Sequence, residues 1–149
     1  MRLMCLDVGE RRIGVALSDA DERLAYGHGV IRRGNLNEDL ATLERLVAEE
    51  EVGTVVVGLP RSLDGSLGRQ AERVQSFAAR LAARLSVPLV FWDERLSTVA
   101  AERALREAGF SGRERRQRVD EQAAVLILDG YLGFRQHQAD AGGADTEYR

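Results

Sequence analysis

Hydrophobic residues near the start of this chain fall in short runs that predict β-strands. Two apolar runs, at residues 3–8 and 13–17, are separated by a polar stretch that contains glycine, which is typical of a β-hairpin. A third extended segment, at residues 24–32, ends in the turn-forming residues 33–35. Three consecutive strands of this kind predict an antiparallel meander.

Helical and strand patterns alternate in the rest of the chain. Leucine and valine recur at helical spacing over residues 36–47, and a valine-rich run at residues 54–59 predicts a strand that is buried on both faces. A second helical pattern covers residues 74–85, a fifth strand covers residues 87–92, and a third helix is expected to end at Gly109. This alternation predicts parallel pairing among the later strands, in an α/β fold.

Composition places the chain among globular proteins. Of its 149 residues, 44% are hydrophobic and 30% are charged, and we expect one domain over residues 1–136. Residues 137–149 have no apolar period, so we expect a disordered tail. No apolar run is long enough to cross a membrane, and the N-terminus lacks the apolar core of a signal peptide, which together predict a cytoplasmic location.

Carboxylates meet apolar elements at three places. Asp7 lies at the end of the first predicted strand, and Asp93 and Glu94 follow the fifth. Asp120 begins the apolar stripe of a last helix, so it faces the core and not the solvent. An alternative for Asp93 and Glu94 is that they only flank the next helix and stabilise its dipole.

Three acids presented together would form an oxygen-rich metal site. The single cysteine and the two distant histidines argue against zinc, so any metal would be magnesium or manganese. Asp7, Glu94 and Asp120 could hold two such ions about 4 Å apart, an arrangement that performs phosphoryl chemistry. Asp93 replaces Glu94 in this hypothesis if the register at the strand end differs by one residue.

Arginine supplies every cationic side chain other than histidine. The formal net charge of −3 argues against a uniformly basic surface, but the loop expected directly before Asp120 is rich in arginine. A loop of this kind could contact a nucleic-acid backbone, or it could simply be solvated. The candidate contacts are Arg113, Arg115, Arg116 and Arg118, together with Arg61.

Four motifs in order give the chain a resemblance to a known family. They are Leu6-Asp7-Val8-Gly9 with Gly14-Val15-Ala16, Val57-Gly58-Leu59-Pro60 with Asp64-Gly65, Asp93-Glu94-Arg95-Leu96-Ser97-Thr98, and Val119-Asp120 with Ala123-Ala124 and Ile127-Leu128. Over residues 2–134 the chain resembles the YqgF family, also called RuvX, of the ribonuclease H-like superfamily. One departure is visible, because arginines stand before the last aspartate where the family often has lysines.

The resemblance implies a fold, a metal site and a substrate. The fold is ribonuclease H-like, a mixed five-stranded sheet flanked by helices, and Asp7, Glu94 and Asp120 match the family's catalytic acids. The family is associated with processing the 5′ end of the 16S ribosomal RNA precursor. A competing proposal for the family is resolution of Holliday junctions, which makes branched DNA a possible substrate.

Two further functions stay open at the level of sequence. Asp7-Val8-Gly9 followed by Gly14 also resembles the first phosphate loop of actin-like and sugar-kinase ATPases. Those enzymes bind nucleotide between two such domains, and this chain has length for one. The remaining alternative is a module that binds nucleic acid or nucleotide without catalysis.

Overall fold

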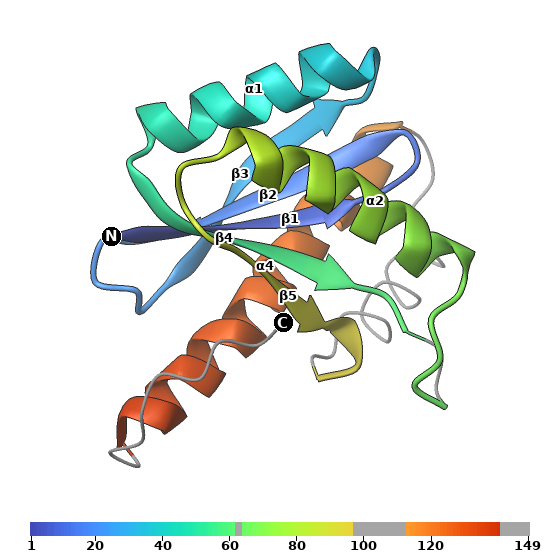
Figure 1. Ribbon diagram of the computed structural model, residues 1–149. Helices are drawn as coiled ribbons and strands as arrows, with labels where there is room; N and C mark the ends of the chain where they lie inside the picture. Colours follow the sequence, from blue (N-terminus) through green and yellow to red (C-terminus); the bar gives the residue numbers. More distant parts are fainter. Residues whose placement is uncertain (62–63, 97–112, 141–149) are drawn as a thin grey trace.

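The chain forms a five-stranded mixed sheet with helices on both faces (Figure 1). In a computed structural model, residues 1–61, 64–96 and 113–140 are described, with residues 113–119 described by their backbone alone. The strands are β1 (Arg2–Val8), β2 (Arg12–Ser18), β3 (Ala25–Arg32), β4 (Val52–Leu59) and β5 (Leu89–Asp93). The helices are α1 (Leu36–Glu49), α2 (Arg69–Arg84), α4 (Arg113–Asp140) and the short 3-10 helix η1 (Glu94–Leu96).

The strand order is β3-β2-β1-β4-β5. The first three strands pair antiparallel as a meander, while β1 pairs parallel with β4, and β4 pairs parallel with β5. The prediction of a mixed five-stranded sheet is therefore confirmed. Because β1, β4 and β5 run in the same direction, their carboxyl ends meet at one end of the sheet.

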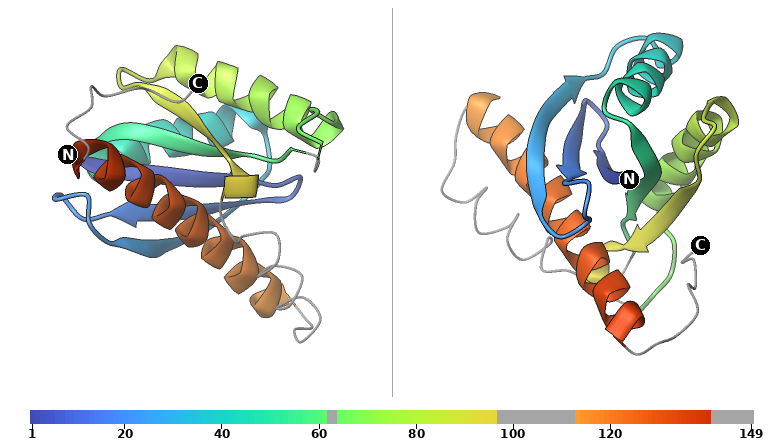
Figure 2. Two further views of the ribbon diagram at one scale, coloured as in Figure 1. Left: turned by 90° about the horizontal axis from the view of Figure 1, so that it is seen from below. Right: turned by 90° about the vertical axis from the view of Figure 1, so that its left-hand side faces the viewer.

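The helices form separate layers on the two faces. Figure 2 shows α1 and α2 on one side of the sheet and α4 crossing the other side. Helix α1 begins after Asn35, whose side chain accepts hydrogen bonds from the backbone N–H groups of Asn37 and Glu38, at 2.9 and 3.3 Å. The alternation of β1 explains both layers, since Met4 and Leu6 join the core under α1 and α2, while Leu3 and Cys5 join the core under α4.

Helix α4 lies unusually close to the sheet. A Cβ atom placed on Gly14 of β2 would lie only 2.2 Å from the backbone oxygen of Asp120. Ala123 and Ala124 are buried on the same helix face, so small side chains on both partners allow this approach. Asp120 therefore lies on the helix face that packs on β2, but it is half-buried and not part of the core.

Two expectations from the sequence are wrong, and a third lies outside the described residues. The arginine-rich segment before Asp120 was predicted to be a loop, but it forms the first turns of α4, which begins at Arg113. The same helix continues to Asp140, beyond the expected start of a tail at residue 137, and residues 141–149 lie outside the described residues. The helix expected to end at Gly109 also lies outside them. In the described part of the chain, no helix is long and apolar enough to span a membrane.

Candidate functional site

Asp7 occupies a gap in the side-chain layer beneath α4. It pairs in register with Gly14 of β2, and the parallel pairing of Leu6 with Val57 sets Gly58 of β4 beside it on the other strand. Residues at one level of neighbouring strands present their side chains to the same face. Asp7 is therefore flanked by two positions with no side chain, and it is only 8% exposed.

Glu94 extends over the glycine on the β4 side. A Cβ atom on Gly58 would lie 3.1 Å from the Glu94 Oε1 atom and 2.7 Å from the Ile127 Cδ1 atom. Burial raises the pKa of the Cys5 thiol, and the negative charges of Asp7 and Glu94 raise it further. Both carboxylates therefore lie near Cys5, on the face of the sheet that α4 covers.

Asp120 lies over the glycine on the β2 side. Its backbone contacts Gly14, and its Oδ2 atom accepts a hydrogen bond of 2.5 Å from the Arg12 Nε–H group. The two side chains are 25% and 21% exposed, so this ion pair is partly shielded from water. No pattern in the sequence indicated this pairing of Asp120 with Arg12.

Asp93 lies apart from this group. Trp92 belongs to the core under α4, so strand alternation directs Asp93 toward the opposite side of the sheet. Its carboxylate accepts hydrogen bonds from the Arg95 side chain, the shortest at 2.7 Å, and one from the Arg95 backbone at 2.9 Å. Burial acts to raise the pKa of Asp93, but these bonds and the charges of Arg95 and Arg61 outweigh it and lower the pKa. The geometry thus favours Glu94 over Asp93 as the partner of Asp7.

The donor chemistry of Asp7, Glu94 and Asp120 fits a hard divalent cation, because all three provide carboxylate oxygens on one face of the sheet. In the described residues, no group of three histidine, cysteine or acidic side chains is close enough to hold a metal ion. The Asp120 carboxylate is instead paired with Arg12, which directs the third acid toward a guanidinium group. Asp120 would have to leave Arg12 to join the other two acids.

The predicted nucleic-acid contacts are only partly described. The Arg61 Nε–H group is buried, and no hydrogen-bond partner for it is found among the described residues. Arg113, Arg115, Arg116 and Arg118 belong to the first turns of α4, and their side chains lie outside the description. Their helix also carries Asp120, which keeps their backbone near the acids.

Sequence reasoning missed a second group of arginines. A cleft of about 810 Å³ opens beside the β1–β2 turn, between the end of β3 and helix α2. Its charged lining consists of Arg11, Arg32, Arg33, Arg73, Arg80 and Glu10. These residues come from three separate segments, and each alone is typical of a solvated surface. The spacing of seven residues between Arg73 and Arg80, which puts both on one helix face, was the available signal.

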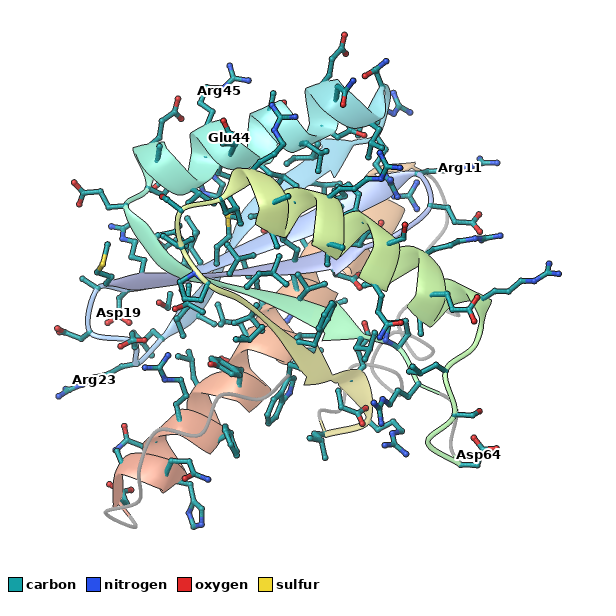
Figure 3. The ribbon with its side chains drawn as sticks, in the orientation of Figure 1. Arg11, Asp19, Arg23, Glu44, Arg45 and Asp64 are labelled. Atoms are coloured by element: carbon teal, nitrogen blue, oxygen red, sulfur yellow. The ribbon has the colours of Figure 1, made fainter. Side chains whose placement is uncertain are left out.

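Figure 3 labels Arg11, one of the residues that line this cleft. Arg11 extends from the β1–β2 turn, at the same end of the sheet as Asp64, while Asp19 and Arg23 lie at the opposite end. The turn also carries Arg12, the partner of Asp120. The acids and the arginine-lined cleft therefore lie at the same end of the sheet, on either side of one turn.

Solved structures with a similar fold support this architecture. The RuvC protein of T. thermophilus, solved in complex with Holliday junction substrate, matches with a TM-score of 0.58 at 14% sequence identity. The match covers 91% of this chain and 96% of that one. A second RuvC structure, from Thermus thermophilus, gives a TM-score of 0.56 at 13% identity. At these identities the likeness concerns the fold, which is RuvC-like and ribonuclease H-like, as expected.

Sequence relatives are much closer. A protein of Moorella thermoacetica named "Putative pre-16S rRNA nuclease" is 55% identical over 132 residues, which cover 89% of this chain and 94% of the relative. A protein of Syntrophomonas wolfei with the same name is 46% identical over 148 residues, covering 99% of this chain and all of the relative. The model of the RuvX family, described as "Holliday junction resolvase", matches residues 1–133. The chain therefore belongs to the RuvX family.

Proposed function

We propose that this chain is a metal-dependent nuclease that hydrolyses phosphodiester bonds in the cytoplasm, during 5′-end processing of the 16S ribosomal RNA precursor. The names of its close relatives support the choice of substrate. The observation that carries the proposal is the position of Asp7 between two glycines, with Glu94 over one and Asp120 over the other.

Asp7, Glu94 and Asp120 are the residues that would hold magnesium or manganese, as two ions in this hypothesis. When bound, such ions lower the pKa of an attacking water and stabilise the departing oxygen. Asp7 is fixed by its strand and almost fully buried. We therefore expect its carboxylate to change position least of the three. Glu94 belongs to the short η1 helix after β5, and Asp120 belongs to α4, so the three acids depend on three different elements.

Arginines would bind the substrate and orient it. A guanidinium group can donate two parallel hydrogen bonds to one phosphate, which fixes the backbone as well as attracting it. Arg61 follows β4 at the end of the sheet where the acids lie, and Arg113, Arg115, Arg116 and Arg118 precede Asp120 on α4. We assign these five residues to contacts with the phosphate backbone.

A second candidate is cleavage of branched DNA. The description of the family model as a Holliday junction resolvase favours it. A module that binds nucleic acid without catalysis is less well supported, because it gives no reason for three carboxylates to lie on one face of the sheet.

Cleavage of two substrates side by side would test the proposal. Labelled precursor 16S RNA and a four-way DNA junction would each be incubated with the wild type and with Asp7→Asn, in magnesium, in manganese and in EDTA. We expect metal-dependent cutting of the RNA by the wild type and none by Asp7→Asn. Asp21→Asn provides a matched control, because Asp21 is an exposed aspartate in the β2–β3 turn.

Each other outcome contradicts a defined part of the proposal. Symmetric cutting of the junction alone would favour the resolvase reading over the ribosomal one. Full activity of a folded Asp7→Asn variant would refute the metal site. Cutting of neither substrate by the wild type would favour a binding module.

A further inference from the structure

The arginine-lined cleft brings together positive charge from three separate segments of the chain. Five arginines and a single acid, Glu10, form its charged lining, although the whole chain carries a formal net charge of −3. Positive charge gathered in this way on an acidic protein produces a local field that attracts polyanions. The cleft is also open to solvent, since Arg11, Arg32, Arg73 and Arg80 are exposed.

Two of the five arginines have partners within the protein that hold their side chains in place beside the cleft. The Arg33 Nη1 group donates a 2.8 Å hydrogen bond to the Gly9 backbone oxygen, and its guanidinium lies 4.9 Å from the centre of the Phe77 ring. Arg33 also lies 3.8 Å from the Asp39 carboxylate, and Arg73 pairs with Glu10. These contacts hold the β1–β2 turn against α1 and α2.

The other three arginines keep their charge for a ligand. In the part of the chain that the structure describes, Arg11, Arg32 and Arg80 form no ion pair with an acidic side chain. They come from the β1–β2 turn, the end of β3 and helix α2, so they border the cleft on three sides. Three uncompensated guanidinium groups around one cleft are suited to a chain of phosphates more than to a single small anion.

The β1–β2 turn carries residues of both the cleft and the candidate active site. Arg11 and Arg12 are consecutive in that turn, with Arg11 lining the cleft and Arg12 paired with Asp120 on the α4 side. The Arg33 backbone N–H group donates a 2.8 Å hydrogen bond to the Arg11 backbone oxygen, which joins this turn to the end of β3. A strand that leaves the acids can therefore cross the turn and enter the cleft.

We propose that the cleft binds the phosphodiester backbone of single-stranded RNA on one side of the cleavage site, with Arg11, Arg32 and Arg80 as its phosphate contacts. The inference rests on the proposed nuclease function, and it adds a binding surface on the α1 and α2 side of the sheet. Binding there depends on charge and not on the metal site. Its three arginines contact phosphates in this proposal, so we expect little sequence preference.

Binding measured without cleavage would test the cleft. Fluorescence anisotropy of a fluorescein-labelled single-stranded RNA of about 20 nucleotides would be measured in EDTA, between 50 and 300 mM salt. We expect the double variant Arg11→Ala/Arg80→Ala to bind about tenfold more weakly at low salt, and its salt slope to fall by about 1.4, since two phosphate contacts on a single strand are lost.

A matched pair of arginines provides the control. Arg23 and Arg45 are exposed and form no ion pair among the described residues, and Figure 3 shows both away from Arg11. Arg23→Ala/Arg45→Ala removes the same charge, and we expect its affinity to stay within twofold of the wild type. Equal losses in the two double variants, or no loss in the cleft variant, would overturn the proposal.

The RNA-binding result tests the cleft separately from the proposed nuclease function. Loss of RNA affinity in the cleft variant, in a protein that cuts neither substrate, would support the cleft and contradict the nuclease. Cleavage by a wild type whose cleft variant binds RNA normally would overturn the cleft and leave the nuclease standing. Equal unfolding free energies for the two double variants and the wild type would confirm that binding, not folding, has changed.

Discussion

The two faces of the sheet meet their helices in different ways. Beneath α1 and α2, large side chains such as Leu43, Phe77 and Leu81 fill the space between helix and sheet. Beneath α4, the helix backbone itself closes on the strand at Gly14, while Gly27 and Gly58 meet the side chains of Glu121 and Ile127. Side chains thus separate the sheet from α1 and α2, whereas the backbone of α4 is in near contact with β2 at Gly14, and side chains such as Ile127 and Leu128 fill the rest of that face.

This difference explains where the two charged regions are found. Close contact on the α4 face fixes the backbone of Asp120 beside Asp7, with little freedom for either to shift. On the other face, the helices stand off far enough for a cleft to open at the end of the sheet and be lined by arginine. The α4 face of the sheet, the near-contact face, is suited to placing reactive groups. The α1 and α2 face is suited to binding a long, flexible ligand.

Gly14→Ala should disrupt the packing of α4 on β2, and we expect it to reduce stability more than the other substitutions. The new methyl group would lie 2.2 Å from the Asp120 backbone oxygen, so the strand and the helix would have to separate. We expect the free energy of unfolding to fall by about 3 kcal/mol, at the upper end of overpacking effects, and cleavage to be lost as Asp120 moves. Urea denaturation would measure the first effect and the cleavage assay the second.

Gly34→Ala is the control for this substitution. Nothing lies within 4 Å of a Cβ atom at Gly34, so the change should leave stability within about 0.5 kcal/mol of the wild type. A similar stability for the Gly14 and Gly34 variants would show that α4 does not contact the sheet as closely as described.

Gly58→Ala should have a smaller effect on stability. Its methyl group would meet the Ile127 Cδ1 atom at 2.7 Å and the Glu94 side chain at 3.1 Å, and both neighbours are the ends of flexible side chains. We expect a loss of about 1.5 kcal/mol in urea denaturation, together with reduced cleavage because Glu94 is displaced. A loss as large as that of Gly14→Ala would contradict the difference between backbone and side-chain contacts.

The near-contact face could largely be predicted from the sequence, because its signals are local. The helical spacing that begins at Asp120 and the small residues that follow it indicate an inward, closely packed helix. The position of Asp7 at a strand end followed from the apolar runs around it. The start of α4 at Arg113 was missed, because the dense arginines read as a solvated loop and carry no apolar period.

The ion pair and the cleft could not be predicted in the same way. Arg12 and Asp120 are 108 positions apart, and their contact depends on how α4 crosses β2. The cleft likewise combines segments that meet only when the β1–β2 turn, the end of β3 and α2 are in place. Contacts of this kind depend on three-dimensional packing, which single-sequence patterns do not specify.

Arg12→Ala should free the Asp120 carboxylate at a small cost in stability. Removing the partly shielded pair with Asp120 should lower the free energy of unfolding by about 1 kcal/mol. We also expect manganese to bind several-fold more tightly, because the guanidinium no longer competes for the Asp120 carboxylate. Isothermal titration calorimetry with manganese would measure this affinity without reference to cleavage.

Arg2→Ala provides a comparison at the other end of β1. Arg2 pairs with Glu50 at 3.0 Å, so the variant loses an ion pair without touching the acids. Its manganese affinity should match that of the wild type. Weaker manganese binding by Arg12→Ala would mean that Arg12 positions Asp120 for the metal and does not compete with it.

Glu10→Gln should have the smallest effect, a gain in RNA affinity. The direction of this change distinguishes the cleft from the acidic site. Loss of an acid from the near-contact face, as in Asp7→Asn, should abolish cleavage, whereas Glu10 is the one acid lining the cleft and neutralises Arg73. Its removal should strengthen RNA binding about twofold, or about 0.4 kcal/mol, as expected for one exposed charge interaction. Glu44→Gln is the matched control, since Glu44 forms an exposed pair with Arg84 outside the cleft and should leave RNA affinity unchanged. Weaker RNA binding by Glu10→Gln would indicate that Glu10 holds Arg73 in position for the phosphate, so that the acid contributes to the cleft instead of opposing its charge.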